Sequence, residues 1–250
     1  QNMIPLDYVE TNASWYKSQA SAEKKLSKLK DAGLNSILIS CSPLHAEHIP
    51  FEKTLGVINA SFKIFGRLGT MIWLPEFLND LTTLSINGTI SFTDYADAMG
   101  KEHAVAAASY YGQLIPGGRA PYRLGDYLPV WPKETFFEGN CSYELLKSGS
   151  GHFDLYGNTI PGICSGISIG PATELGETYS GKYIDNMPVV RVLAKRGVKG
   201  LYQWALKNFG YKALDGYVGK CHLCFDIRRY LVEIGVSLPE LAPKQIYERV

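Results

Sequence analysis

The sequence has little net charge. Its 25 lysine and arginine residues nearly balance 24 aspartate and glutamate residues, and the formal net charge of the 250-residue chain is +1. Proteins that bind nucleic acid or an anionic membrane surface through a general electrostatic field carry a marked excess of basic residues. The balance argues against that kind of binding, and we expect no nucleic-acid partner.

Long hydrophobic runs are also missing. Apolar stretches such as residues 37–39 and 71–74 fall far below the roughly 18 residues that a transmembrane helix needs. The opening residues, QNMIPLDYVETNASWY, lack the charged start and apolar run of a signal peptide, and the chain does not begin with Met. We therefore expect a soluble protein with no membrane partner, and we interpret the sequence as part of a longer chain.

Cysteine is scarce. The sequence has five, which are Cys41, Cys141, Cys164, Cys221 and Cys224. An odd number offers no even disulfide framework, and a chain of this length buries a core large enough to fold without disulfides. A reducing, cytoplasmic compartment is the simpler interpretation. The competing interpretation, a secreted glycoprotein, would use the four Asn-x-Ser/Thr sequons at Asn12, Asn59, Asn87 and Asn140.

Strands and helices alternate in the first part of the chain. Short apolar runs at residues 4–10 and 34–41 flank a segment with helical apolar spacing that ends at Gly33. A second helical pattern ends at Gly66 and leads to a strand at residues 70–74. Alternating strands and helices predict parallel strands joined by right-handed crossovers.

The alternation stops beyond about Pro75. A helix is predicted over residues 101–111, and a Gly- and Pro-rich passage, LIPGGRAPYRLGDYLPVWP, follows it. We place a domain boundary there, between residues 1–114 and 115–250. In the second part, HFDLYGNTIPGIC predicts a hairpin that turns at Gly157. Further helices are predicted near residues 187–195, 200–209 and 223–234.

Three short motifs come close to known nucleotide or metal sites without matching them. GETYSGKY, residues 176–183, has Tyr183 where a phosphate-binding loop needs Ser or Thr. GSG at residues 149–151 lacks the third glycine of a dinucleotide fold, and HAEH at residues 45–48 is not HExxH. These nucleotide-binding and zinc-protease classes are therefore unsupported.

A CxxC pair begins a predicted helix within YVGKCHLCFDIRRYL, residues 217–231. Cysteines at this spacing aim both sulfurs at one point, and the helix N-terminus together with Lys220 is expected to lower the thiol pKa of Cys221 and Cys224. A thioredoxin-like redox pair normally follows an early strand, whereas this pair lies near the end of the sequence. The motif therefore favours a metal site over a redox site.

A zinc ion or an iron-sulfur cluster needs about four such ligands. Cys141 and Cys164 are the candidates for the other two, and a Pro161-Gly162 pair would allow close backbone approach to an inorganic centre. Either cysteine could instead be an ordinary core residue, since a free buried cysteine behaves as a small hydrophobe. Cys41, at the end of a strand, is expected to be core.

Four segments together resemble radical S-adenosylmethionine (radical SAM) enzymes. They are VETNASWY at residues 9–16, ILISCSPLHAEHIPFEKT at 37–54, HFDLYGNTIPGICSGISIG at 152–170 and KCHLCFDIRRYL at 220–231. The resemblance is closest to members with a C-terminal auxiliary iron-sulfur region of the SPASM or twitch kind. It spans nearly the whole chain as scattered short motifs, whose order and spacing carry it.

The resemblance implies an α/β fold, with a partial TIM-type (β/α) barrel from the third strand onward over residues 1–114. A smaller α+β auxiliary-cluster domain would follow over residues 115–250. Substrates of parallel barrels bind at the carboxyl ends of the strands. The residues implied there for SAM are Glu10, Thr11 and Asn12 on one strand, and Ser40 and Ser42 on the next.

The resemblance also implies the cofactors and partners. An auxiliary [4Fe-4S] cluster would be bound by Cys141, Cys164, Cys221 and Cys224. The family's CxxxCxxC loop, which holds the [4Fe-4S] cluster that reduces SAM, is absent and is expected to precede residue 1, so these residues alone should be inactive. An electron donor such as ferredoxin or flavodoxin is implied, and the small-molecule or peptide substrate is unknown.

Several residues border the expected centre. Arg228 and Arg229 follow Cys224 and either place charge near it or lie in solvent, while His152, Asp154 and His222 are neighbours with no assigned catalytic role. No catalytic residue is identified. The alternative function is a binding or structural module without turnover, in which the four cysteines hold zinc.

Overall fold

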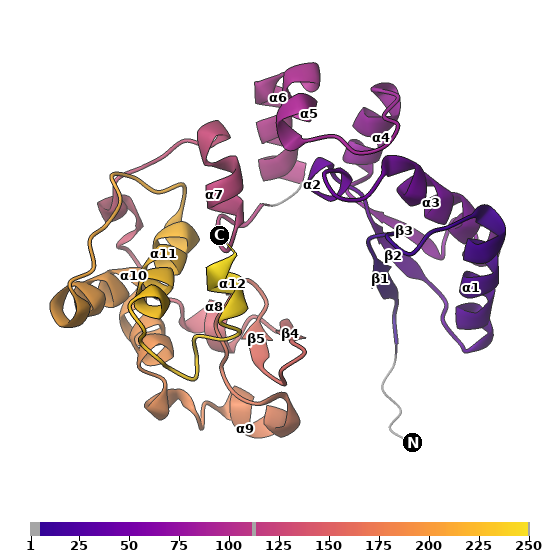
Figure 1. Cartoon of the computed structure of the whole chain (residues 1–250). Helices are drawn as coiled ribbons and strands as arrows, with labels where there is room; N and C mark the ends of the chain where they lie inside the picture. The colour runs from indigo at the N-terminus through magenta and orange to yellow at the C-terminus, as the bar shows by residue number, and fades with distance from the viewer. Residues whose placement is uncertain (1–5, 112–113, 250) are drawn as a thin grey trace. The chain divides into compact units, whose positions relative to one another are not determined.

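The computed structural model describes residues 6–111 and 114–249 (Figure 1). The chain divides into two compact units, Gln1–Gln113 and Leu114–Val250. The boundary placed on the sequence lay one residue further along, after residue 114. The described helices are too short or too polar to cross a membrane.

The first unit contains an open parallel sheet. Its strands are β1 (Val9–Thr11), β2 (Ile37–Ser40) and β3 (Thr70–Trp73), in the order β1-β2-β3. Helices α1 (Gln19–Asp31) and α3 (Phe51–Phe65) connect them and pack against each other beside the sheet (Figure 1). Apolar side chains of both helices and of β2 form one buried cluster, as the alternating pattern in the sequence predicts.

The expected TIM-type barrel is wrong. The described part of this unit has three short strands, and after β3 the chain continues as helices α4 (Pro75–Thr83), α5 (Phe92–Met99) and α6 (Lys101–Ala106). Leu74, with a φ of 64°, turns the chain out of the sheet, and Pro75 starts α4 directly. A barrel must pair its first and last strands, whereas β1 and β3 each pair only with β2 among the described residues.

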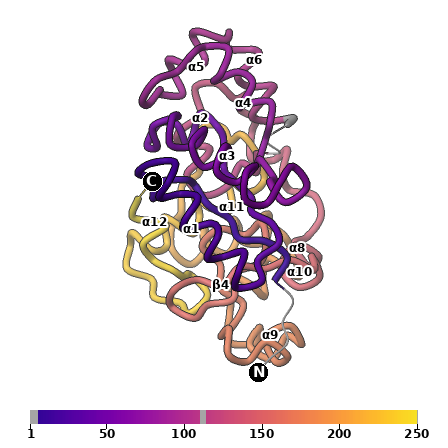
Figure 2. Tube along the Cα trace, turned by 90° about the vertical axis from the view of Figure 1, so that its right-hand side faces the viewer, coloured from indigo at the N-terminus to yellow at the C-terminus, as the bar shows by residue number. Residues whose placement is uncertain are grey.

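The second unit is mainly helical and is the longer of the two, so the expectation of a smaller α+β domain is also wrong. Its strands are β4 (Gly151–Phe153) and β5 (Thr159–Pro161), the antiparallel hairpin that the sequence predicts. Helices α10 (Pro188–Phe209) and α11 (Lys220–Glu233) lie side by side in the core (Figures 1 and 2).

The described part of the second unit has four shorter α-helices. They are α7 (Ala120–Leu124), α8 (Ser142–Leu146), α9 (Leu175–Ser180) and α12 (Gln245–Glu248). Two helices predicted near residues 187–195 and 200–209 are one element, α10, with a break at Gly197, where φ is 61° and ψ is −162°. A Cβ at this position would lie 2.4 Å from the backbone oxygen of Gly139. Glycine therefore lets the segment before α8 pack directly on α10.

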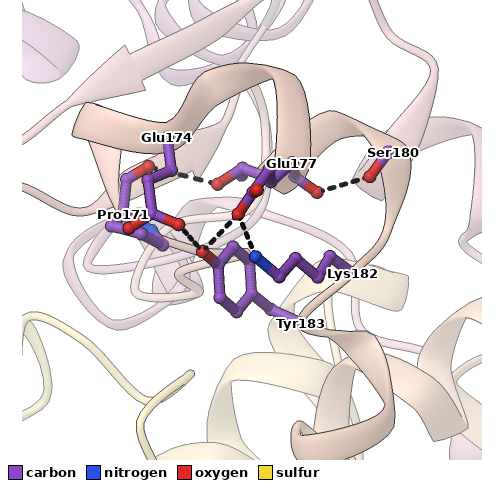
Figure 3. A network of polar contacts seen from close by, with 7 residues as sticks. Pro171, Glu174, Glu177, Ser180, Lys182 and Tyr183 are labelled. Atoms are coloured by element: carbon purple, nitrogen blue, oxygen red, sulfur yellow. Dashed lines mark hydrogen bonds and ion pairs between the residues drawn. The ribbon is translucent and has the colours of Figure 1, made fainter.

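The GETYSGKY segment follows no strand and lies on α9 and the turn after it. The Lys182 ammonium pairs with the Glu177 carboxylate, and the Tyr183 hydroxyl donates to the carboxylates of Glu174 and Glu177 (Figure 3). Burial is small there, and the hydrogen bond to Glu177 raises the pKa of Lys182. This lysine belongs to a surface ion network, which agrees with the exclusion of a phosphate-binding loop.

Candidate metal centre

Cys221 and Cys224 lie on the first turn of α11. Residues three apart on a helix share a face, so both side chains point the same way. Gly219 precedes the helix, and a Cβ there would lie 2.5 Å from the Pro116 side chain. The start of α11 is therefore packed closely against the segment that leads into α7.

Cys141 comes immediately before α8. Its backbone N–H donates to the carbonyl oxygen of Leu193 on α10 at 3.0 Å, and its own carbonyl accepts from Leu145 at 3.0 Å. The close packing at Gly197 brings the chain before Cys141 onto α10. These contacts hold a buried cysteine at the junction of two helices.

Cys164 follows β5 in a turn. Its backbone N–H donates to the Pro161 carbonyl at 3.1 Å, and its carbonyl accepts from Ile167 at 3.1 Å. The expected close approach of Gly162 is to Ser150, whose hydroxyl would lie 2.3 Å from a Cβ on this glycine. Gly162 therefore closes the hairpin and does not line the cysteine site described next.

The four cysteines of the second unit line one cavity. Its volume is about 450 Å³ when the part open to solvent is included. Five chain segments supply the wall, and the lining side chains that carry sulfur or charge are Cys141, Cys164, Cys221, Cys224, Glu144, Lys220 and Arg228. Cys41 lies in the other unit, in its core, where burial alone raises the pKa of the thiol to about 12.

The four cysteines line the cavity without forming a metal-binding group in the described structure. Within residues 6–111 and 114–249, no group of three or more His, Cys, Asp or Glu side chains is placed to hold a metal ion. Gly117 forms part of the wall, and a Cβ on it would lie 3.3 Å from the Cys221 Cβ. Backbone atoms of Gly117 therefore form one side of the cavity, and this residue has no side chain to fill it.

Three thiols of this cavity, those of Cys141, Cys164 and Cys221, resist ionisation. Burial, followed by the neighbouring Cys224 sulfur, raises the pKa to about 12 for Cys141 and Cys164 and to about 11 for Cys221. The expected lowering at the helix N-terminus is therefore wrong for Cys221, because burial outweighs the helix dipole and Lys220. A metal that binds here must displace protons.

A lysine and a glutamate form an ion pair in the wall. The Lys220 ammonium lies 2.8 Å from the Glu144 carboxylate, and both side chains are partly buried. Burial acts to lower the pKa of Lys220, but the hydrogen bond to Glu144 and the Cys141 sulfur together raise it. Lys220 thus stays charged next to the cysteines.

Arg228 is the most informative residue of the wall. It is 3% exposed, and its guanidinium donates to the carbonyl oxygens of Ser165 (2.7 Å) and Cys224 (3.2 Å) and to the Tyr247 hydroxyl (2.6 Å). The guanidinium carbon also lies 5.2 Å from the Phe225 ring centroid. No carboxylate of the described residues forms an ion pair with it.

Neutral hydrogen-bonding groups and cysteine sulfurs stabilise the charged guanidinium of Arg228. Burial alone lowers the pKa of this arginine, but the Tyr247 hydroxyl and the sulfurs of Cys224 and Cys164 outweigh burial and raise it. Arg229 differs: its guanidinium lies 3.2 Å from the Glu233 carboxylate and over the Tyr122 ring. Of the two arginines that the sequence singled out, only Arg228 lines the cavity.

The other expected neighbours do not line the cavity. His222 points into the core between Tyr122 and Tyr217, where burial lowers its pKa. Asp154 accepts from two backbone N–H groups of the β4–β5 turn, and His152 is exposed on β4. These three residues have structural or surface positions.

The residues implied for SAM lie in the first unit, at the carboxyl ends of β1 and β2. The Ser40 hydroxyl donates to the Glu10 carboxylate at 3.4 Å, so these two strand ends meet. Thr11 accepts from the Trp15 indole N–H at 2.7 Å, and Asn12 accepts from the Ser14 backbone N–H at 3.1 Å. Each of these contacts joins residues that are close in sequence or residues on neighbouring strands.

Ser42 caps a short helix. Its hydroxyl accepts from the His45 backbone N–H at the start of α2 (Pro43–Ala46), and it lies 2.7 Å from His45 Nδ1. Burial lowers the pKa of His45, while the Glu10 carboxylate acts in the opposite direction. His45 therefore belongs to the cluster of polar side chains at this edge of the sheet. In the sequence it stands out only within HAEH, which does not match the zinc-protease motif.

Comparisons of the chain with protein-family models, with curated proteins and with solved structures give no match. The resemblance to radical SAM enzymes therefore depends on the four sequence segments, and the function depends on what the cysteine cavity can do.

Proposed function

We propose that the second unit binds an iron-sulfur centre, a [4Fe-4S] cluster, through Cys141, Cys164, Cys221 and Cys224. The observation that carries the proposal is the cavity itself, where four cysteines from distant parts of the sequence meet beside a buried guanidinium. The charge of Arg228 and the arrangement of the ligands bear on which centre binds in this cavity.

Charge supports an anionic occupant. A buried arginine with no carboxylate partner is costly, because the desolvation of a charge is repaid only by close opposite charge or by hydrogen bonds. Arg228 has hydrogen bonds, and the groups beside it that can become strong anions are sulfurs. Four thiolates on iron or zinc carry net negative charge, so a bound centre would complete the pairing of Arg228.

The two candidate centres need different arrangements of the sulfurs. Zinc bonds sulfur at about 2.3 Å, which requires four tightly grouped thiolates. In a [4Fe-4S] cluster each thiolate would bind a different iron. The four cysteines line one cavity, and the auxiliary-cluster region that the resemblance implies favours the cluster. A zinc site, in a module without turnover, remains the second candidate because the thiolate set is the same.

The wider function is proposed from the resemblance. By the resemblance, a second [4Fe-4S] cluster would supply the electron for reductive cleavage of SAM, and the resulting 5′-deoxyadenosyl radical would act on the substrate. Within this chain, Glu10, Thr11, Asn12, Ser40 and Ser42 offer polar groups at the strand ends for SAM.

The test is anaerobic purification with metal and sulfide analysis. We expect a brown protein with roughly four iron atoms and a matching amount of acid-labile sulfide per chain. Serine at any of the four positions should lower the iron content sharply, whereas the matched control Cys41→Ser should keep it. A colourless protein with one zinc per chain would favour the second candidate, and absence of both metals would refute both.

A further inference from the structure

We propose that a small anionic molecule, bearing a carboxylate or phosphate group, binds in a second hollow of the same unit, next to the cysteine cavity. This hollow has a volume of about 800 Å³ when its open part is included. Anion binding in this hollow needs no metal. Only the interpretation of the hollow as a substrate site rests on the proposed function.

The two hollows share a wall. Gly117, Gly118 and Ser165 line both of them. Gly118 has a φ of 58°, and a Cβ there would lie 3.4 Å from the Ser165 side chain, while Gly117 is in close contact with Cys221. The partition is therefore made of backbone and one serine, which brings a molecule in the second hollow close to the cysteines.

Positive charge gathers in the second hollow. Arg119, before α7, and Arg249, after α12, both line it, and its wall contains no aspartate or glutamate. Neither arginine forms an ion pair with another described residue. Both side chains are exposed, and an anion bound in the hollow would be attracted by two positive charges.

The chemistry of the wall defines the ligand class. A guanidinium binds carboxylate or phosphate oxygens through paired N–H donors. Ser165 and Gln245 add a hydroxyl and an amide, and a proline and an isoleucine supply apolar surface. Small-molecule sites combine a few converging polar groups with apolar walls in this way. A molecule with at least one acidic group and a short apolar part fits this wall.

Calorimetric titration of the full chain with two probes, succinate and inorganic pyrophosphate, tests the proposal. Ionic strength is held constant with chloride, so that general screening does not imitate binding. We expect saturable binding of at least one probe. Binding of succinate alone would identify carboxylate ligands, and binding of pyrophosphate alone would identify phosphate ligands.

Two variants locate the site. Arg119→Gln and Arg249→Gln should each weaken binding by about tenfold or more, the usual loss for a charge-assisted hydrogen bond. The matched control is Arg67→Gln, an exposed arginine of the first unit, which should leave the affinity unchanged. Equal binding by all three variants, or no saturable binding of either probe, would overturn the proposal.

The titration is repeated on protein with and without its metal. Anion binding in a protein that proves to contain no metal would sustain this inference while refuting the proposed function. A metal-loaded protein that binds neither probe would do the reverse. The two proposals therefore fail separately.

Discussion

Replacing Arg228 with methionine tests the electrostatic reasoning most directly. The substitution keeps an apolar stem of similar length, removes the charge, and leaves the Ser165 carbonyl without its 2.7 Å donor. In metal-free protein two effects oppose each other. Loss of the hydrogen bonds costs about 1–3 kcal/mol, and relief of an uncompensated buried charge returns a similar amount. We expect a change in unfolding free energy close to zero.

The metal-loaded protein should respond differently. A unit charge about 6 Å from the centre contributes about 3 kcal/mol at an effective dielectric constant of about 20. Arg228 is fully buried, so solvent screening does not reduce this figure much. A cation stabilises the reduced, more negative state of the cluster. Its removal should therefore lower the one-electron reduction potential, by about 120 mV.

The assay is a redox titration of the centre in Arg228→Met, with Arg228→Lys as the control that keeps the charge. The lysine variant should retain most of the wild-type potential, because the effect depends on charge more than on the shape of the side chain. Equal potentials in wild type and Arg228→Met would refute the assignment of Arg228 as the compensating cation. So would equal shifts in the methionine and lysine variants.

Three further results follow from geometry and from the directions of the pKa shifts. Cys141, Cys164 and Cys221 have raised thiol pKa values of about 11 to 12, so a metal that binds them must displace protons. Metal uptake measured by chelator competition should therefore strengthen as pH rises through the neutral range, and a pH-independent affinity would contradict this. Gly197→Ala should destabilise the protein to urea by more than about 1 kcal/mol, since it combines a positive φ with a clash against Gly139, while the open helical site Gly176→Ala should not. Burial raises the pKa of Glu240 above its ordinary 4.5, so the unfolded state ionises first and stability should fall as pH rises above that value. Glu240→Gln should remove this loss, and the two proteins should converge below pH 4.5; parallel curves at all pH values would refute it.

Local periodicity predicted the elements well where one face of an element is buried. The helix after Gln19, the strand at residues 37–40 and the helix of the CxxC pair all appear where apolar spacing placed them. The last of these begins at Lys220, three residues before its predicted start at residue 223. Gly219 gives no side-chain cap there, so the usual sequence signal of a helix N-terminus is missing.

Long-range arrangement was harder to predict. The barrel was implied by the family resemblance, whereas the sequence pattern itself lost its strand-helix alternation beyond about Pro75, where the structure has helices. The meeting of Cys141 and Cys164 with the CxxC pair was expected, although their role as ligands stays a prediction. The shift of the Cys221 thiol pKa was predicted with the wrong sign because burial cannot be seen in a spacing pattern.

Arginines were also hard to interpret from sequence. Arginine is mostly found on protein surfaces, and the burial of Arg228 depends on Tyr247 and on the turn at Ser165, both distant in sequence. Arg119 and Arg249 line one hollow, although they lie near opposite ends of the sequence of the second unit. A single sequence contains no signal that such residues meet.

The order of the four cysteines along the chain sets the timing of assembly at their cavity. Cys141 and Cys164 leave the ribosome well before α11, so a growing chain carries two thiols that no partner yet completes. A centre shared by all four can be inserted only after α11 has emerged and docked on α10. If the proposed centre binds here, its full set of ligands becomes available only once α11 has joined the rest of this unit.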